Sequence, residues 1–346
     1  MKSMKALYFP ELHKIELRQV EKPALKDEND VIVKITLTTI CGSDLHIIHG
    51  AIPSKPGFVL GHEYVGVIEE VGSAVKNFQK GDRVIGPPVP FCGKCDSCHA
   101  GDYAHCNAGI HGSSCHLWGT HAEYMRVPNA EACLVHVPDE LSDEDVIFTA
   151  DILSTGYSAV MQAKVKPLDT VVIFGAGPVG LSALAAAKLY SPREIILVGR
   201  KDKFRLNVGK KIGATDIIVS SEEDVISTIK KLTNGRGADV AIDAVGVEPT
   251  IQQAVRCVGI NGRVSVVGIS GANVTLPLGE VFFNNISIDM GLGDIGHVKY
   301  LMNLIKEKFI DLSPLITHRM RLDEIEEAFK LFENRNEDVL KILVKP

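Results

Sequence analysis

Four of the eight cysteines lie close together in one short stretch, and their spacing is that of a metal site. They are Cys92, Cys95, Cys98 and Cys106. Four thiolates in one loop form the ligand set of a tetrahedral structural zinc site, in which every coordination position is closed to substrate. A ferredoxin-type iron–sulfur cluster normally continues with a short spacer and a Cys-Pro pair, whereas Cys106 precedes Asn107. The pattern therefore predicts structural zinc, and not a disulfide framework, in a long chain without a secretion signal.

A second set of residues suited to metal binding is dispersed along the chain. Cys41 opens the segment Cys41-Gly-Ser-Asp-Leu-His46, and His62 lies in a Gly-His-Glu segment. A soft thiolate and an imidazole suit zinc, but a catalytic zinc site needs a third ligand and one open position. From spacing alone, Cys41 reads equally as a small buried hydrophobe and His62 as a hydrogen-bonded core histidine.

A glycine-rich segment carries the pattern of a dinucleotide-binding turn. Gly175, Gly177 and Gly180 follow a short apolar run that ends at Phe174, and Pro178 suits the first turn of a helix. The first two glycines permit a tight turn and the approach of a pyrophosphate, and the third lets the helix pack on the strand. We expect the cofactor to contact this whole turn, Val179 included. The alternative is a glycine-rich turn in another α/β fold.

The end of the next strand indicates which cofactor is bound. An NAD-preferring site usually has Asp or Glu there, to hold the ribose hydroxyls. This chain has Gly199, followed by Arg200, Lys201 and Lys203. A guanidinium can bind a 2′-phosphate through two hydrogen bonds, so the segment favours NADP(H) over NAD(H). The alternative is that these basic residues form an ordinary solvated surface.

The elements that must position these residues fall into two patterns. Most of the first 150 residues consist of short β-rich runs with Gly, Pro and Asp between them. From residue 171 onward, apolar strand patterns alternate with helical ones, which predicts a doubly wound parallel sheet. A different pattern returns near the end, with helices over 296–307 and 322–334 and a strand over 340–344. We therefore expect an α/β protein whose outer domain is interrupted by an inserted nucleotide-binding fold.

Composition excludes several classes of protein. The 346 residues are 45% hydrophobic and 23% charged, which is ordinary for a globular protein and unlike a disordered one. The net charge of −6 argues against a broad nucleic-acid surface, and no apolar run is long enough to span a membrane. Since the N-terminal residues lack a signal-peptide core, we expect a cytoplasmic protein.

Taken together, the motifs resemble the zinc-containing alcohol dehydrogenases of the medium-chain dehydrogenase/reductase family. The zinc signature of that family matches Gly61-His62-Glu63-x-x-Gly66 with Gly72 and Val75, and the similarity extends to the segment Pro314–His318. The resemblance implies a GroES-like β-barrel catalytic domain over 1–153 and 294–346, a Rossmann domain over 154–293, and an active site in the cleft between them. Bacterial secondary-alcohol dehydrogenases are the closest in type.

The resemblance also implies roles for individual residues. Cys41, His62 and Asp151 match the catalytic zinc ligands, with Asp151 where horse-liver-type enzymes have a cysteine; the alternative for Asp151 is a carboxylate at a helix N-terminus. Glu63 matches a carboxylate that contacts the metal during exchange of water and substrate. The remaining assignments are Ser43 and His46 as a proton relay and Thr155 as a contact to the nicotinamide. The alternatives are a turn hydroxyl for Ser43, a surface imidazole for His46 and a helix cap for Thr155.

These assignments predict reversible hydride transfer between an alcohol and NADP, giving a ketone or aldehyde, with two zinc ions per chain. A polyol dehydrogenase that uses NAD is the alternative within enzymes, and a non-catalytic redox sensor is the alternative outside them. Bacterial relatives imply a homo-oligomer, with a tetramer favoured. Trp118 is expected to line the substrate cleft. The histidines around the cysteine loop are expected to be solvated, namely His99, His105, His111, His116 and His121.

Overall fold

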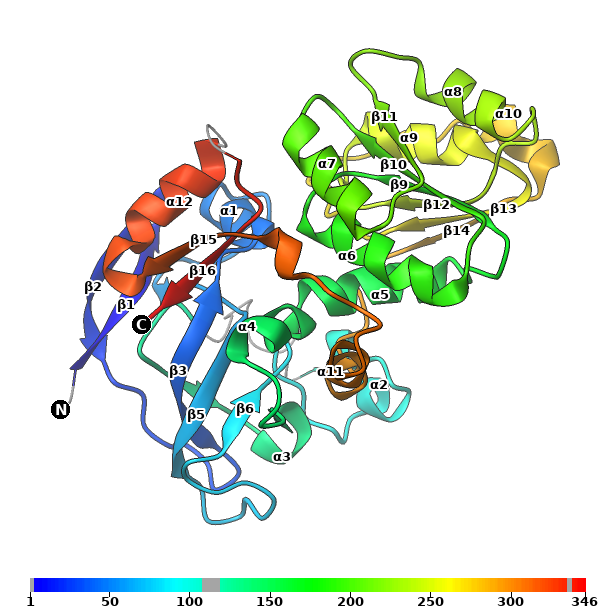
Figure 1. Ribbon diagram of the computed structural model, residues 1–346. Coiled ribbons are helices and arrows are strands. Elements are labelled where there is room, and N and C mark those ends of the chain that lie inside the picture. The colour runs from blue at the N-terminus through cyan, green and yellow to red at the C-terminus, as the bar shows by residue number, and fades with distance from the viewer. Residues whose placement is uncertain (1–2, 108–118, 335–337) are drawn as a thin grey trace. The chain divides into compact units, whose positions relative to one another are not determined.

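The computed structural model describes residues 3–107, 119–334 and 338–346, and the chain forms two compact units (Figure 1). Unit 1 combines Met1–Asp151, Asp294–Lys308 and Ile316–Pro346. Unit 2 combines Ile152–Gly293 with the short segment Phe309–Leu315. Unit 1 is thus assembled from three separate stretches of chain. Trp118, His111 and His116 lie outside the described residues.

The main sheet of unit 1 is built around β3 (Val31–Thr39), a run of β-branched residues that is mostly buried. It pairs antiparallel with β5 (Tyr64–Val71), with β7 (Tyr124–Val127) and with β16 (Lys341–Lys345). The strand order is β15-β16-β3-β5-β6-β8, and a second sheet has the order β2-β1-β4. The other strands are β1 (Ser3–Glu11), β2 (Lys14–Glu21), β4 (Phe58–Val59), β6 (Arg83–Ile85), β8 (Val135–His136) and β15 (Ile316–Arg321). The last stretch of the chain therefore completes the sheet that the first stretch begins.

Short helices connect and cover these strands. The helix α1 (Gly42–Ile48) follows β3 directly, and α12 (Ile325–Asn334) buries Ile325, Ala328 and Phe329 on one face. The charged residues of α12 alternate with these buried positions and face solvent, as the sequence pattern predicts. The other helices of unit 1 are α2 (Asp96–His99), α3 (Ala130–Cys133), α4 (Asp143–Val146) and α11 (Val298–Lys306).

Unit 2 contains a six-stranded parallel sheet with the order β11-β10-β9-β12-β13-β14. The central strand β9 (Thr170–Phe174) is buried at every position, as expected for a parallel strand covered on both faces. It lies between β10 (Glu194–Gly199) and β12 (Ala238–Asp243), so the strand order reverses beside it. The outer strands are β11 (Asp216–Val219), β13 (Val258–Val266) and β14 (Ser287–Met290). This is the doubly wound order in which ligands bind at the carboxyl ends of the strands.

The helices of unit 2 alternate with these strands along the chain. The helix α6 begins at Pro178 with Gly177 as its N-cap, as the glycine motif predicts. The others are α5 (Ile152–Gln162), α7 (Lys203–Ile212), α8 (Val225–Leu232), α9 (Glu248–Cys257) and α10 (Leu278–Val281). In the described part of the chain, none of the helices combines the length and the apolar character needed to cross a lipid bilayer.

Candidate functional site

Four potential metal ligands from three segments of unit 1 converge, and we call them the ligand cluster: Cys41, His62, Glu63 and Asp151. One ligand atom from each lies within 4.8 Å of every other. The Asp151 Oδ2 atom is 3.4 Å from Cys41 Sγ and 3.3 Å from His62 Nε2. The structure therefore brings together residues that are far apart in the sequence.

Local backbone geometry presents each of these side chains. Cys41 is the extended N-cap of α1, and Asp151 stands just before α5. His62 follows Gly61, whose φ of +98° is one that residues with a side chain rarely adopt. A Cβ on Gly61 would also lie 2.5 Å from Thr120 Oγ1. The turn before His62 therefore requires glycine.

A buried carboxylate that the sequence motifs did not indicate, Asp44, lies against two of the ligands. The Asp44 Oδ1 atom lies 3.2 Å from His62 Nδ1, and Asp44 Oδ2 accepts a hydrogen bond from the Cys41 amide at 2.9 Å. Carboxylates commonly hold the second nitrogen of a metal-binding histidine, which leaves Nε2 free for the metal. Although burial alone would raise the pKa of Asp44, His62 and His121 lower it well below its ordinary value. Asp44 thus stays ionised beneath the cluster.

His121 corrects one prediction, because it is fully buried and not solvated. Its Nε2 lies 3.3 Å from Asp44 Oδ2, and its Nδ1 lies 3.1 Å from Thr38 Oγ1. The Thr38 hydroxyl in turn donates to the Glu63 carbonyl at 2.8 Å. His121 lies beside β3 and not in the cysteine loop, so its imidazole is buried against that strand. His99 and His105 are exposed, as predicted.

A fully buried lysine supports the other side of the cluster. The Lys341 Nζ atom, on β16, donates to Glu63 Oε1 at 2.7 Å and to the Ile40 carbonyl at 2.9 Å. Glu63 is itself a member of the ligand cluster, and Ile40 directly precedes another member, Cys41. Burial raises the pKa of Glu63 to about 7 against the opposing effect of Lys341. Burial opposes the charge of Lys341, but Glu63 and Cys41 raise its pKa above the ordinary value, so the ammonium stays protonated.

The ligand cluster fits a zinc ion. Tetrahedral ligands at zinc distances would place their donor atoms about 3.3–3.6 Å apart, close to the separations of Asp151 from Cys41 and His62. The Glu63 Oε2 atom is buried without a hydrogen-bond partner, although buried carboxylate oxygens are normally paired. Burial raises the pKa of Cys41, and Asp151 raises it further, so the thiol keeps its proton unless a cation is bound.

Ser43 and His46 lie on successive turns of α1. The Ser43 hydroxyl is 3.2 Å from His62 Nε2, so it borders the ligand cluster. His46 is exposed, and partial burial together with nearby His49 lowers its pKa. A hydroxyl at the cluster and an imidazole near solvent is an arrangement that can move a proton outward.

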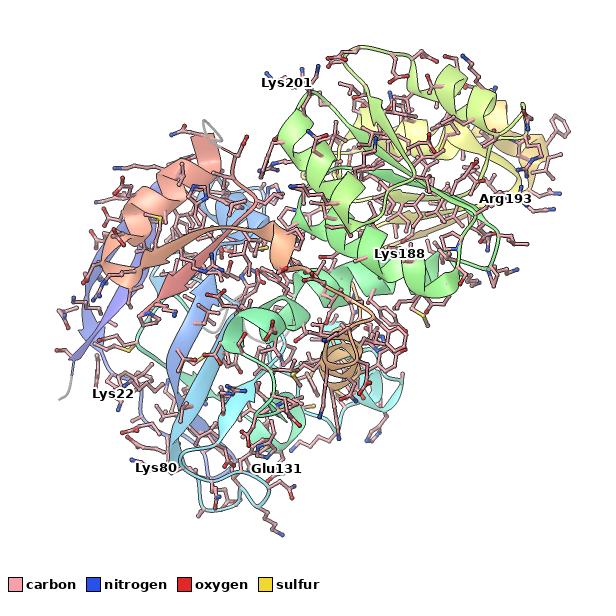
Figure 2. The ribbon with its side chains drawn as sticks, viewed as in Figure 1. Lys22, Lys80, Glu131, Lys188, Arg193 and Lys201 are labelled. Atoms are coloured by element: carbon pink, nitrogen blue, oxygen red, sulfur yellow. The ribbon has the colours of Figure 1, made fainter. Side chains whose placement is uncertain are left out.

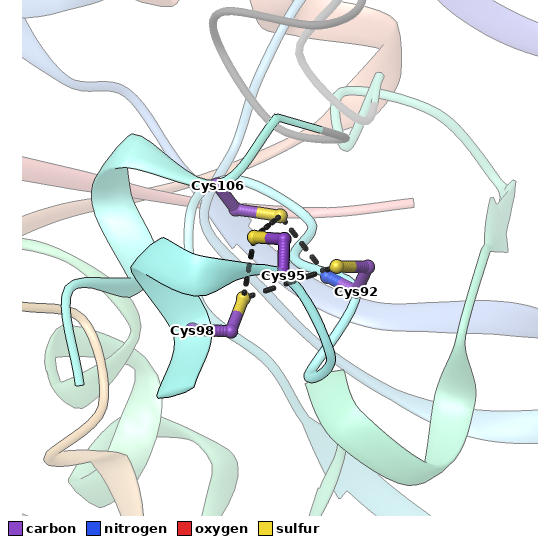
Figure 3. A group of neighbouring side chains, drawn as sticks. All are labelled: Cys92, Cys95, Cys98 and Cys106. Carbon is purple, nitrogen blue, oxygen red and sulfur yellow. Dashed lines mark hydrogen bonds between the residues drawn. The ribbon is translucent and has the colours of Figure 1, made fainter. Parts of the chain in front are cut away.

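The second metal site is the cysteine cluster of Cys92, Cys95, Cys98 and Cys106, whose sulfur atoms point toward one another (Figure 3). Cys95 is the N-cap of α2, and Cys106 follows a short 3-10 helix, Tyr103–His105. The Sγ atom of Cys98 lies 3.6 Å from that of Cys95 and 4.0 Å from that of Cys92, and all four cysteines are free of disulfides. A tetrahedral zinc site with bonds of about 2.3 Å requires sulfurs about 3.8 Å apart. The cluster therefore fits a closed zinc site.

The surroundings of these thiols lower the pKa of some and raise the pKa of another. Backbone hydrogen bonds from Cys98 and Asn107 lower the pKa of Cys95 to about 6. A backbone hydrogen bond from Lys94 likewise lowers the pKa of Cys92. Burial and neighbouring thiols raise the pKa of Cys98 to about 12. Cys95 therefore loses its proton readily, whereas Cys98 needs a bound metal to do so.

The glycine turn of unit 2 has the geometry that its motif predicts. Gly175 has a φ of +103°, and a Cβ on Gly180 would collide with the Gly175 carbonyl oxygen. A Cβ on Gly177 would meet nothing within 4 Å, so its backbone borders open space at the start of α6. Val179 is half-buried in the first turn of this helix. The amides of a helix N-terminus beside open space suit the pyrophosphate of a dinucleotide.

The basic segment Arg200, Lys201 and Lys203 lies directly after β10 and is exposed; Figure 2 shows Lys201 extending from this loop. Lys203 pairs loosely with Glu222 at 3.3 Å. The nearby acid Asp202 caps α7 and accepts from the Arg205 amide at 3.1 Å. Gly199 ends β10, and Thr155 lies inside α5, so it does not cap that helix.

Comparisons with known proteins agree with this geometry. Residues 27–139 match the alcohol dehydrogenase GroES-like domain, and residues 178–307 match the zinc-binding dehydrogenase domain. An alcohol dehydrogenase of Cupriavidus necator is 37% identical over 99% of both chains. The NADP-dependent isopropanol dehydrogenase of Thermoanaerobacter brockii is 33% identical over 99% of both. The solved apo form of zinc-dependent alcohol dehydrogenase 2 from Streptococcus pneumonia is 39% identical, covers 99% of this chain and 98% of its own, and superposes with a TM-score of 0.93.

Fold, metal clusters and relatives together define a zinc-binding dehydrogenase of two domain types, one GroES-like and one Rossmann-like. The chain belongs to the zinc-type alcohol dehydrogenases of the medium-chain dehydrogenase/reductase family. It is an oxidoreductase that acts on CH–OH groups, so the predicted fold class and enzyme class are confirmed. The non-catalytic alternative loses its support. The roles of individual site residues stay predictions.

Replacing Cys95 with Ser should remove one zinc ion per chain and destabilise unit 1, because a closed zinc site contributes folding energy. We expect the melting temperature to fall by about 3 °C or more, which corresponds to a loss of about 2 kcal/mol in a chain of this size. Elemental analysis and thermal unfolding measure the two effects. The exposed neighbour Lys94→Ser is the control and should keep both values. Equal zinc content in the two variants would contradict the assignment.

Replacing Lys341 with Met should lower the free energy of unfolding by about 3–5 kcal/mol, since it leaves Glu63 buried without its partner. The double variant with Glu63→Gln should recover part of this loss, because it removes the unpaired charge. Lys345→Met, on the exposed end of the same strand, should change stability by only about 0.5 kcal/mol. Urea unfolding followed by circular dichroism gives these values. A loss as small for Lys341 as for Lys345 would refute the importance of the buried pair.

Proposed function

We propose that the protein oxidises secondary alcohols to ketones, reversibly, with NADP as the hydride acceptor. The observation that carries this proposal is the ligand cluster, in which Asp151 takes the third position beside Cys41 and His62. This thiolate, imidazole and carboxylate set would hold a zinc ion and leave one of its positions open to substrate. The similarity to an NADP-dependent isopropanol dehydrogenase over nearly the full length supports both the substrate class and the cofactor.

In this proposal, side chains of the protein accept the proton of the substrate alcohol and pass it toward solvent. A zinc ion, when bound, supplies the Lewis-acid chemistry that lowers the pKa of an alcohol hydroxyl. The Ser43 hydroxyl borders the cluster and accepts the alcohol proton while it releases its own toward solvent. His46, one turn further along α1, is the exposed base that receives it. Its lowered pKa keeps the imidazole neutral and able to accept near pH 7.

Asp44 and Lys341 support the ligands, and Glu63 has a separate role. Asp44 directs His62 Nε2 toward the metal through the opposite ring nitrogen. Lys341 holds one oxygen of Glu63 and leaves Oε2 unpaired on the side of the cluster. Glu63 can therefore contact the metal through Oε2 while substrate and water exchange. The cysteine cluster would hold the second zinc ion, which has a structural role.

Cofactor preference follows from the basic segment. Arg200 stands where an NAD-specific site has an acid, and its guanidinium is exposed at the end of β10. A guanidinium there can form a bidentate pair with the 2′-phosphate of NADP, with the nearby lysines adding positive charge. The glycine turn from Gly175 to Gly180 receives the pyrophosphate in either cofactor.

The activity is tested by the absorbance of reduced nicotinamide, with 2-propanol or 2-butanol and with NADP or NAD in separate reactions. We expect reduction of NADP that a zinc chelator abolishes. Cys41→Ser should lower kcat/KM by about a hundredfold or more, because removal of a ligand costs several kcal/mol of transition-state stabilisation. Activity on polyols with NAD, and not on simple secondary alcohols, would favour a polyol dehydrogenase instead. Full activity of Cys41→Ser would overturn the ligand assignment.

The variant Arg200→Asp should shift the ratio of kcat/KM values for NADP and NAD by about 10- to 100-fold toward NAD. The loss of charge-assisted hydrogen bonds to the 2′-phosphate gives this range. Lys210→Asp makes the same charge change on the exposed face of α7 and serves as the control. An equal ratio in both variants and the parent would remove the phosphate-binding role from Arg200.

We also propose that the protein is a homo-oligomer, with a tetramer favoured by the bacterial relatives. Large apolar side chains are exposed on unit 2 near β14, which is an edge strand: Phe282 at 74%, Phe283 at 88% and Met290 at 74%. Exposed apolar patches and open strand edges are typical of association sites. Light scattering of the purified protein should give a multiple of 37.5 kDa. A monomeric mass at micromolar concentration would contradict the proposal.

A further inference from the structure

Two exposed histidines from separate segments of unit 1 face each other with matching ring nitrogens. His13 Nδ1 lies 3.1 Å from His49 Nδ1, and the ring centroids are 5.4 Å apart. His13 is in the turn between β1 and β2, and His49 is the C-cap of α1. We call these two residues the imidazole pair. Neither belongs to the ligand cluster or to the cysteine cluster.

A carboxylate fixes the ring orientation of one member of the imidazole pair. His49 Nε2 lies 2.7 Å from Glu333 Oε1, at the end of α12. A carboxylate can only accept, so Nε2 carries the proton and Nδ1 of His49 presents a lone pair to His13. This is the arrangement of most metal-binding histidines, whose second nitrogen donates to a carboxylate.

Backbone contacts hold the two residues beside each other before any ligand arrives. The His13 amide donates to the Ile48 carbonyl at 2.9 Å, which ties the turn to the end of α1. His13 has a φ of +63°, so its position in the turn is tightly specified. The C-terminal end of a helix also carries partial negative charge, which favours a cation beside His49.

The separation of the two nitrogens suits a shared metal ion. Ring nitrogens at about 2.0–2.1 Å from one ion lie about 2.9 Å apart at a right angle and about 3.4 Å apart at the tetrahedral angle. The observed 3.1 Å falls between these values. Imidazole ligands suit Zn²⁺, Cu²⁺ and Ni²⁺ and disfavour Mg²⁺ and Ca²⁺. Water would complete the coordination, because both side chains are exposed.

We propose that His13 and His49 form a third, surface metal site for a borderline divalent transition ion, with Glu333 as the positioning carboxylate. In the metal-free pair, His13 Nδ1–H donates to His49 Nδ1. When the ion binds, His13 moves its proton to Nε2 by exchange with water and presents Nδ1 to the metal, so no net proton is released. The ion then links the β1–β2 turn to α1 and, through Glu333, to α12.

The site is tested by calorimetric titration of Ni²⁺ into the zinc-loaded full-length chain, prepared without a polyhistidine tag. We expect one additional Ni²⁺ per chain. The variants His13→Asn and His49→Gln should each weaken binding at least about tenfold; Asn also tolerates the left-handed backbone at position 13. Glu333→Ala keeps both ligands and should weaken binding by about tenfold, the effect typical of an orienting carboxylate.

The control is His136→Asn, which removes an exposed histidine whose Nε2 lies beside the Asn77 carbonyl. It should bind Ni²⁺ as the parent does. Equal Ni²⁺ binding by the parent and by a double variant, His13→Asn with His49→Gln, would overturn the proposal. So would an affinity unchanged in both single variants. Circular dichroism and zinc content, measured on every variant, separate a lost site from a lost fold.

Discussion

The buried ion pair between Lys341 and Glu63 joins the parts of unit 1 that the rest of the site depends on. Lys341 comes from the last strand, yet its ammonium holds both the Ile40 carbonyl and the Glu63 carboxylate. Glu63 is a member of the ligand cluster, and Ile40 directly precedes another member, Cys41. A buried charge is costly unless it is well paired. The segments that carry Ile40 and Glu63 must therefore stay within hydrogen-bond distance of the Lys341 ammonium. The last stretch of unit 1 thus supports a cluster formed by the first stretch, although the chain between them builds unit 2.

Asp44 plays the complementary role on the other side of the cluster. One carboxylate serves the Cys41 amide, His62 Nδ1 and His121 Nε2, so the ionised Asp44 and its histidines stabilise one another. The cluster is thus in contact with two buried charged residues, Asp44 and Lys341. Negative ligands gathered in a buried place repel one another unless a cation is present. The polar network therefore favours a cation at the site and determines which ligand atoms face that cation.

The sequence predicts best those features that are local. The cysteine cluster lies within one loop, and the glycine turn lies within one strand-turn-helix, so spacing alone indicates both. The contact between Cys41 and Asp151 spans 110 residues, and only family resemblance suggested it. Asp44, His121 and Lys341 escape prediction because a charged residue gives no sign in sequence that it will be buried and paired. The packing role of Gly209 in α7 is likewise visible only in the fold, where a Cβ at this position would collide with a Leu197 methyl group.

The three-part construction of unit 1 has a consequence for the order of events during synthesis. Nearly all of unit 2 is one continuous stretch, so it can fold as soon as that stretch has left the ribosome. Lys341 is made 301 residues after Ile40, and β16 must still pair with β3 before the sheet is complete. Closing so long a loop is slow compared with local folding. The nucleotide-binding half is therefore expected to mature first, and the ligand cluster remains unfinished, with its thiol exposed to oxidation, until the last strand is in place.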